Sequence, residues 1–187
     1  MAAESLVAFC RAVRERSTEN RDAMHRLMAG RLIGNAVGVF RQELDSLVRV
    51  LYLLSIRDKA YRQKLIDDTV AGKRWRRRDS KAYVTDREMV DAANRMHGWA
   101  ESVYRFGCAF IHLSKLHDYH TTDPFLALPA EERAQLLDHL RRYHGGPDGG
   151  APIFADIVPY LPRVLDKISS NLKVYIADLS KQKNLES

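Results

Sequence analysis

The amino-acid sequence predicts an all-α fold, an up-and-down bundle of about five to six helices. Apolar residues recur at gaps of three and four over most of the chain, which is the spacing of amphipathic helices. Residues that start and stop helices divide this pattern, and no segment has the alternation and turn residues of a β-hairpin. The length of 187 residues suits one domain with a sizeable core, so we expect residues 1–187 to form a single helical domain.

Two helices are expected in the first third of the chain. The first covers about residues 4–16, and Ser17-Thr18-Glu19-Asn20 supplies residues that stop one helix and start another. The second covers about residues 21–55, and its apolar seam has the spacing of a bundle helix or coiled coil. The partner of this seam lies either in the same chain or in a second copy. The seam consists of Val37, Phe40, Leu44, Leu47, Leu51 and Leu54.

Three glycines are spaced four apart in this second helix. Gly30, Gly34 and Gly38 therefore fall on one stripe, although each mid-helix glycine costs about 1 kcal/mol relative to alanine. The stripe favours close packing of another helix over a bound ligand. A break in the helix near Gly30 is the alternative.

The later helices are indicated by capping signals. Thr85 and Glu88 have the spacing of a capping box, which opens a helix expected to continue to about residue 116. Pro129 followed by acidic residues begins another helix. These remaining helices are expected over about 58–70, 129–144 and 160 or 162–179, with a Gly- and Pro-rich loop over 147–152.

Charge and motif content narrow the class of protein. The net charge of +6 favours an anionic partner, and nucleic acid is the leading candidate. No apolar run is long enough to span a membrane and no secretory signal is recognisable, so we expect a cytoplasmic protein that does not bind membranes. Cys10 and Cys108 lack metal-ligand spacing, which fits a reducing compartment. No phosphate-binding glycine loop, GxSxG or dinucleotide fingerprint is present.

A basic run is the first candidate nucleic-acid site. Lys73, Arg74, Arg76, Arg77 and Arg78 surround the indole of Trp75, a composition suited to phosphate contacts with base stacking. The alternative is a solvated basic loop in which the indole covers the edge of the core and the arginines face water.

Arg105 and His112 are the candidate catalytic pair. They are seven residues apart, close to two helical turns, so in a helix they share one face. Arginine carries a permanent planar charge suited to phosphate, and histidine can transfer a proton near neutral pH. The alternative is structural: Arg105 pairs with Glu101 four residues earlier, and His112 is a hydrogen-bonded core residue.

The run Arg105-Phe106-Gly107-Cys108-Ala109-Phe110-Ile111-His112 within an all-helical chain resembles the HEPN superfamily, whose ribonucleases share Arg-x4-6-His. The resemblance covers about residues 20–180. It implies a homodimer with a composite active site, and RNA cleavage by attack of the 2′-hydroxyl without a metal or other cofactor. His112 is then the general acid or base, and Arg105 stabilises charge on the phosphate. Such an enzyme would be a toxin or antiviral defence effector with an antitoxin or effector-complex partner.

Four other polar residues are interpreted relative to the candidate catalytic pair and the charged helix faces. His117 and His120 are expected near the same groove in contact with phosphate, since no zinc motif supports a metal site with His112. Glu43 is a candidate for orienting a catalytic arginine, and a surface charge ladder with Arg41 and Arg49 explains Asp45.

The competing hypothesis is a non-catalytic helical module that binds nucleic acid or a partner protein through the basic run. Arg105 and His112 then serve only packing or ion pairing. The enzyme hypothesis instead requires both side chains to be exposed in a cleft.

Overall fold

The computed structural model describes residues 2–98, 101, 103–104, 119 and 121–184, and it confirms an all-α bundle. Within these residues the only β-type pairing is an isolated bridge between Arg76 and Tyr83. No described helix is both long and apolar enough to cross a membrane. The elements are α1 (Ala2–Ala29), α2 (Ile33–Ser55), α3 (Lys59–Val70), α4 (Asp86–Asn94), α6 (Ala130–His144), α7 (Phe154–Ile157), η2 (Val158–Tyr160) and α8 (Leu161–Ser180).

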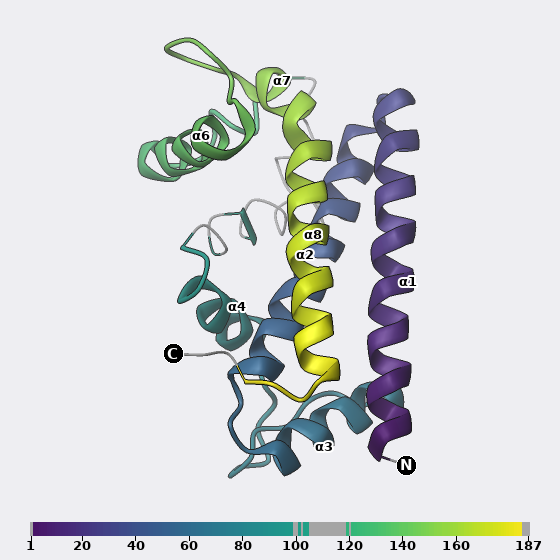
Figure 1. Ribbon diagram of the computed structural model, residues 1–187. Coiled ribbons are helices and arrows are strands. Elements are labelled where there is room, and N and C mark those ends of the chain that lie inside the picture. The colour runs from purple at the N-terminus through teal and green to yellow at the C-terminus, as the bar shows by residue number, and fades with distance from the viewer. Residues whose placement is uncertain (1, 99–100, 102, 105–118, 120, 185–187) are drawn as a thin grey trace.

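Helix α2 is the centre of the bundle (Figure 1). It packs against α1, α4 and α8, while α1 also contacts α3 and α8. Helices α1 and α2 are antiparallel, α8 runs in the same direction as α2, and α3 crosses the end of the bundle near the N-terminus. Helix α6 stands beside the opposite end, next to the start of α8.

The apolar seam of α2 is buried inside this one chain. All six predicted seam residues are inaccessible or nearly so. They join a core to which α8 contributes Leu165, Ile168, Leu172 and Ile176. The partner of the seam is therefore in the same chain, and the seam itself gives no reason to expect a second copy.

The predicted boundary at residues 17–20 is wrong, because α1 continues through it to Ala29. Ser17 and Asn20 resemble capping residues, but their side chains donate hydrogen bonds to buried Glu43 on α2. The break lies after Gly30, as the alternative predicted. Arg31 has a left-handed φ of 55°, and the amides of Arg31 and Leu32 donate to Met28 and Leu27, which is the Schellman pattern of a helix end.

This break removes Gly30 from the glycine stripe of α2. Tyr119 approaches Gly34, where its ring would lie 3.6 Å from an added β-carbon. At Gly38 no described atom lies within 4 Å of such a carbon. In the described part of the chain, the contact at this stripe is therefore a tyrosine side chain.

The predicted helix over 85–116 is also interrupted. The capping box is confirmed, with the Glu88 amide donating to Thr85 Oγ1 at 3.3 Å and the Thr85 amide donating to Glu88 at 2.8 Å. Helix α4 nevertheless ends at Asn94, and a turn that includes Gly98 follows before helical residues resume at Glu101.

The other predicted helices are confirmed within two residues at each end. Asp58 caps α3 by accepting hydrogen bonds from the amides of Ala60 and Tyr61. Helix α6 ends where Gly145 adopts a left-handed φ of 71°. The predicted loop over 147–152 separates α6 from α7, and α8 follows directly after η2.

Candidate active site and nucleic-acid interface

Arg105, His112, His117 and His120 lie outside the described residues, so their predicted roles stay predictions. Residues on either side of this segment are described. Tyr104 is buried and helical, and the guanidinium carbon of Arg41 on α2 lies 3.4 Å from its ring centroid. At the other side, Tyr119 contacts the Gly34 position, also on α2, and its ring centroid lies 6.2 Å from that of Phe154. Both flanks of the segment therefore contact α2.

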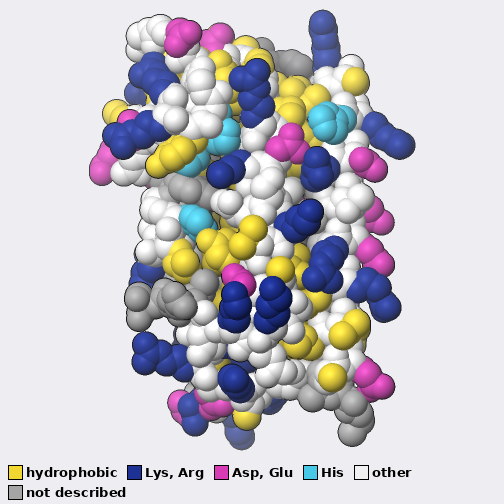
Figure 2. Space-filling model, viewed as in Figure 1, with side chains coloured by type: hydrophobic (Ala, Val, Ile, Leu, Met, Phe, Trp, Pro, Cys, Tyr) yellow, Lys and Arg dark blue, Asp and Glu magenta, His cyan; other side chains and the backbone are white. Residues whose placement is uncertain are grey.

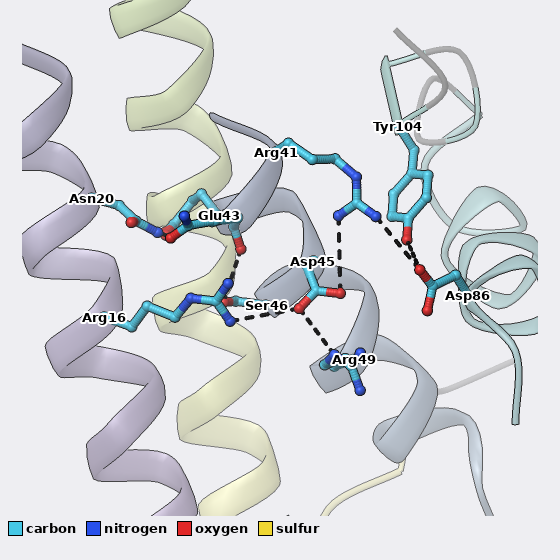
Figure 3. Close-up of polar contacts among 10 residues, drawn as sticks. Arg16, Asn20, Arg41, Glu43, Asp45, Ser46, Arg49, Asp86 and Tyr104 are labelled. Carbon is cyan, nitrogen blue, oxygen red and sulfur yellow. Dashed lines mark hydrogen bonds and ion pairs between the residues drawn. The ribbon is translucent and has the colours of Figure 1, made fainter. Parts of the chain in front are cut away.

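Tyr104 also connects α2 to the first residue of α4. Its hydroxyl donates a 2.7 Å hydrogen bond to Asp86 Oδ2, and Arg41 Nη2 lies 3.7 Å from the same oxygen (Figure 3). A carboxylate at a helix N-terminus is favoured by the unpaired amides of the first turn. Asp86 thus supports α4 and fixes the residue that directly precedes Arg105.

Asp45 is the second carboxylate of this polar cluster. Its oxygens lie 3.0 Å from Arg49 Nε, 3.5 Å from Arg16 Nη1 and 3.9 Å from Arg41 Nη1 (Figure 3). The predicted pairing of Asp45 with Arg41 and Arg49 is confirmed. The prediction that this pairing lies at the surface is wrong. The Asp45 side chain is 16% exposed and that of Arg41 only 6%. Charges withdrawn from water need partners, so this cluster is part of the fold.

Glu43 lies on a different side of α2 and is completely buried. Its carboxylate accepts hydrogen bonds from Ser17 at 2.5 Å, Asn20 at 2.9 Å and Ser169 at 2.8 Å. These neutral donors come from α1 and α8, so Glu43 joins the three long helices. Among the described residues no arginine contacts its carboxylate, and the contacts explain Glu43 as a core residue. Its predicted role in orienting a catalytic arginine has no support from them.

The indole of Trp75 is not available for base stacking. Trp75 is 5% exposed, its Nε1 donates a 2.7 Å hydrogen bond to Thr69, and its ring stacks on Tyr52 with centroids 5.9 Å apart. The alternative interpretation, an indole that covers the edge of the core, is therefore correct. The RNA-stacking role predicted for Trp75 is wrong because the apolar ring gains more from burial than an exposed loop position offers.

The five cations of the basic run are all exposed, but they differ in pairing. Arg77 forms a 2.8 Å ion pair with Glu88, and Arg78 forms a 2.9 Å ion pair with Asp58. Arg76 donates to the Lys81 carbonyl at 2.8 Å. Lys73, Arg74 and Arg76 have no ion-pair partner among the described residues, and of these three only Arg76 makes side-chain hydrogen bonds there, so Lys73 and Arg74 are the most available for a phosphate.

An exposed aromatic ring lies beside the basic run at Tyr83. It is 37% exposed, and the guanidinium carbons of Arg74 and Arg76 lie 4.1 Å and 4.8 Å from its centroid. The bridge that pairs Arg76 with Tyr83 sets this arrangement. Because Tyr83 is outside the basic run, its only sequence signal was an aromatic residue shortly after the cations.

The ion pair with Arg77 has a clear effect on the capping box. The hydrogen bond from Arg77 is the largest cause that lowers the pKa of Glu88 to about 2, and hydrogen bonds from Thr85 act in the same direction. One carboxylate therefore caps α4 and neutralises one arginine of the basic run. The basic loop and the start of α4 form a single electrostatic unit.

Two hollows in the surface were not predicted from the sequence. One is a largely apolar groove of about 600 Å³ between α1, α2 and the end of α3, bordered by Arg11, Arg16 and Arg49. The other is a cavity of about 320 Å³ between α6, α8 and the turn after α4. The described lining of this cavity includes His97, His139, His144, Lys167 and Asn171. Figure 2 shows histidines gathered near α6 and α8.

The histidines of this cavity are biased towards the neutral form. Burial is the main cause that lowers the pKa of His139 to about 4, and the neighbouring His144 adds to it. Burial also lowers the pKa values of His144 and His97, with Lys167 as the next cause in both. Among the described residues, no group of three or more His, Cys, Asp or Glu is arranged to hold a metal ion. No sequence motif links these residues, because they come from three separate segments.

Comparisons with models of protein families, with curated proteins and with solved structures found no match to this chain. The resemblance to the HEPN superfamily therefore depends on the Arg105 to His112 spacing and on the helical architecture.

Proposed function

We propose that this protein is a metal-independent endoribonuclease in which Arg105 and His112 form the catalytic pair. The 2′-hydroxyl of RNA loses a proton to a general base and forms a bond to the adjacent phosphorus. The bond from phosphorus to the 5′-oxygen breaks, and that oxygen takes up a proton. The products are a 2′,3′-cyclic phosphate and a 5′-hydroxyl. His112 serves the proton transfers, and Arg105 stabilises the added negative charge on the phosphate oxygens.

The observation that carries this proposal is the packing on α2 of Tyr104 and Tyr119, which lie on either side of the motif segment in the sequence. Tyr104 directly precedes Arg105, and it is held by Arg41 and Asp86. Arg41 itself is buried and shares Asp45 with Arg16 and Arg49. A rigid support of this kind is what a catalytic arginine needs, because small displacements cost much of the rate.

RNA binding is supported by the exposed cations of the basic loop. Lys73 and Arg74 carry charge that no described carboxylate neutralises, and Tyr83 adds an aromatic face beside Arg74. Contacts of this type bind phosphates and stack bases with little sequence preference.

The second candidate function is a non-catalytic module that binds RNA or a partner protein. It is favoured by the same loop, because that interface is complete without Arg105 or His112. Cleavage assays separate the two functions.

The test compares the wild type with Arg105→Ala and His112→Ala. Each substitution is expected to abolish cleavage of RNA while helical content and melting temperature remain those of the wild type. His25→Ala and Arg87→Ala are matched controls, since both residues are exposed on described helices, and both variants should cleave normally.

Three further measurements define the chemistry. Cleavage should persist in EDTA, the products should carry cyclic phosphate and 5′-hydroxyl ends, and a 2′-deoxy residue at the scissile position should block the reaction. If pure protein binds RNA without cutting it, and His112→Ala mainly lowers the melting temperature, the non-catalytic module is correct.

A further inference from the structure

The cavity between α6 and α8 has an unbalanced positive lining. No carboxylate is among its described lining residues. Lys167 and Asn171 are four apart on α8 and so lie on one face of the helix. In the described part of the chain, neither side chain has a hydrogen bond or ion pair. The Lys167 ammonium and the Asn171 amide thus line the same cavity and are available to bind a ligand.

His144 contributes a buried polar atom that has no partner. Its Nε2 is inaccessible to solvent and makes no hydrogen bond. The ring centroid of His139 lies 5.5 Å from that of His144, and the exposed ring of Tyr143 lies 4.8 Å from His139. An unsatisfied buried polar atom is costly, and such atoms are rare in folded proteins.

We propose that this cavity binds a phosphate monoester, either that of a free nucleotide or the 5′-phosphate of an RNA. Lys167 supplies the charge, Asn171 supplies a hydrogen bond, and the volume of about 320 Å³ exceeds what a phosphate alone requires. Tyr143 and Met96 stand exposed beside it, and they offer flat and apolar surface to an attached base. The proposed catalytic residues are not among those named for this site, and the proposal does not depend on them.

The charged groups around His139 and His144 favour the binding of an anion. Lys167 and Arg163 of α8 both disfavour a second positive charge on His144. The nearest acid of α6 is Asp138, which is already paired with Arg142 at 2.8 Å. The carbonyl end of α6 is also occupied, because Gly145 and Gly146 donate to Leu140, and Arg163 donates to His144. Within the described lining of this cavity a bound anion would therefore meet Lys167 and Asn171 and no carboxylate, whereas Glu101 and Asp138 line the adjoining hollow.

The test follows the histidine ring signals by NMR during titration of the full chain. The probes are inorganic phosphate, adenosine 5′-monophosphate, and a 2′-O-methyl RNA oligonucleotide that carries either a 5′-phosphate or a 5′-hydroxyl and cannot be cleaved. We expect saturable shifts of the His139 and His144 signals.

Two variants of α8 make the test specific. Lys167→Ala should weaken binding by at least about tenfold, because it removes a charge-assisted hydrogen bond. Lys173→Ala is the matched control, since Lys173 is an exposed lysine of the same helix, outside the described lining, and it should bind like the wild type.

The outcomes distinguish the two sources of the phosphate. Binding of the mononucleotide as tight as that of the oligonucleotide identifies a free nucleotide as the ligand. A preference for the 5′-phosphorylated over the 5′-hydroxyl oligonucleotide, with weak binding of the mononucleotide, identifies an RNA end. The proposal is overturned if no probe shifts these histidines at millimolar concentration, or if Lys167→Ala and Lys173→Ala bind equally well.

Discussion

Glu43 and Asp45 are two residues apart on α2, yet they belong to different environments. Glu43 is buried among neutral donors of α1 and α8, whereas Asp45 is shared by three guanidinium groups. The helical turn separates them by about 200° around the axis of α2. One carboxylate therefore stabilises the core, and the other balances three arginines, of which Arg41 contacts Tyr104.

At Glu43 we predict a large stability loss on truncation. Glu43→Ala leaves three donors without their acceptor and creates a cavity, so the free energy of unfolding should fall by about 2–4 kcal/mol. Glu43→Gln keeps the shape and one oxygen acceptor, so it should lose less. Urea denaturation measures both values.

The control for Glu43 is Glu19→Ala, because Glu19 is an exposed glutamate of α1. Its effect should stay within about 0.5 kcal/mol. Full stability of Glu43→Ala combined with lost RNA cleavage would contradict the core role and restore the orienting role.

At the scale of elements, helix ends were predicted correctly where the capping contacts are local in sequence. They were predicted wrongly where the polar side chains bond to a distant part of the chain. The capping box at Thr85 and the Asp58 cap are formed by neighbours in sequence, so they could be recognised there. Ser17 and Asn20 carry the same residue types, but their acceptor Glu43 lies at least 23 positions away. No pattern within α1 contains that information, and a capping interpretation was the natural error.

The basic loop should bind RNA mainly through its unpaired cations. The double substitution of Lys73 and Arg74 by Gln should weaken binding and reduce the slope of log K against log salt by about 1.4, or about 0.7 per phosphate contact. The matched substitution of Arg77 and Arg78 should have a smaller effect, because Glu88 and Asp58 already neutralise them. Fluorescence anisotropy at several salt concentrations gives both slopes. Equal slopes for the two variants would show that pairing is irrelevant, and unchanged slopes would exclude the loop from the interface.

The capping unit of α4 should make the protein sensitive to acid. The folded-state pKa of Glu88 is lowered to about 2 from an ordinary 4.5, so its contribution is present above pH 4.5 and lost as the pH falls towards 2. Because Glu88 is partly exposed, we expect at most about 1 kcal/mol. Glu88→Gln should be less stable than the wild type at neutral pH, and the difference in the free energy of unfolding should vanish as the pH approaches 2. A difference that is constant with pH would contradict this assignment.

At the scale of the whole molecule, the bundle was predictable and its hollows were not. The six-residue seam of α2 specified a buried central helix through its spacing alone. The cavity beside α8 depends on how α6 is placed after a turn and a loop, and it joins His97, His139 and Lys167 from separate segments. Trp75 was ambiguous for a similar reason, because its burial is decided by Tyr52 and Thr69.

A composite active site requires two copies of the chain, although the buried seam of α2 no longer argues for them. We therefore expect light scattering at micromolar concentration to give twice the chain mass of 21.4 kDa. Mixing inactive Arg105→Ala chains with wild-type chains should then lower activity more than simple dilution does. A strict monomer that still cleaves RNA would contradict the composite site and leave the catalytic pair within one chain.

The position of α8 against α2 has a consequence for biosynthesis. Chains are made from the N-terminus, so α8 is completed after every other described helix. Until then Ile168, Leu172 and Ile176 are missing from the core, and the central helix has one uncovered apolar side. Ser169, one of the donors to Glu43, is missing as well. The nascent chain therefore cannot complete its native core before α8 has been made, and until then the uncovered apolar side of α2 is open to aggregation.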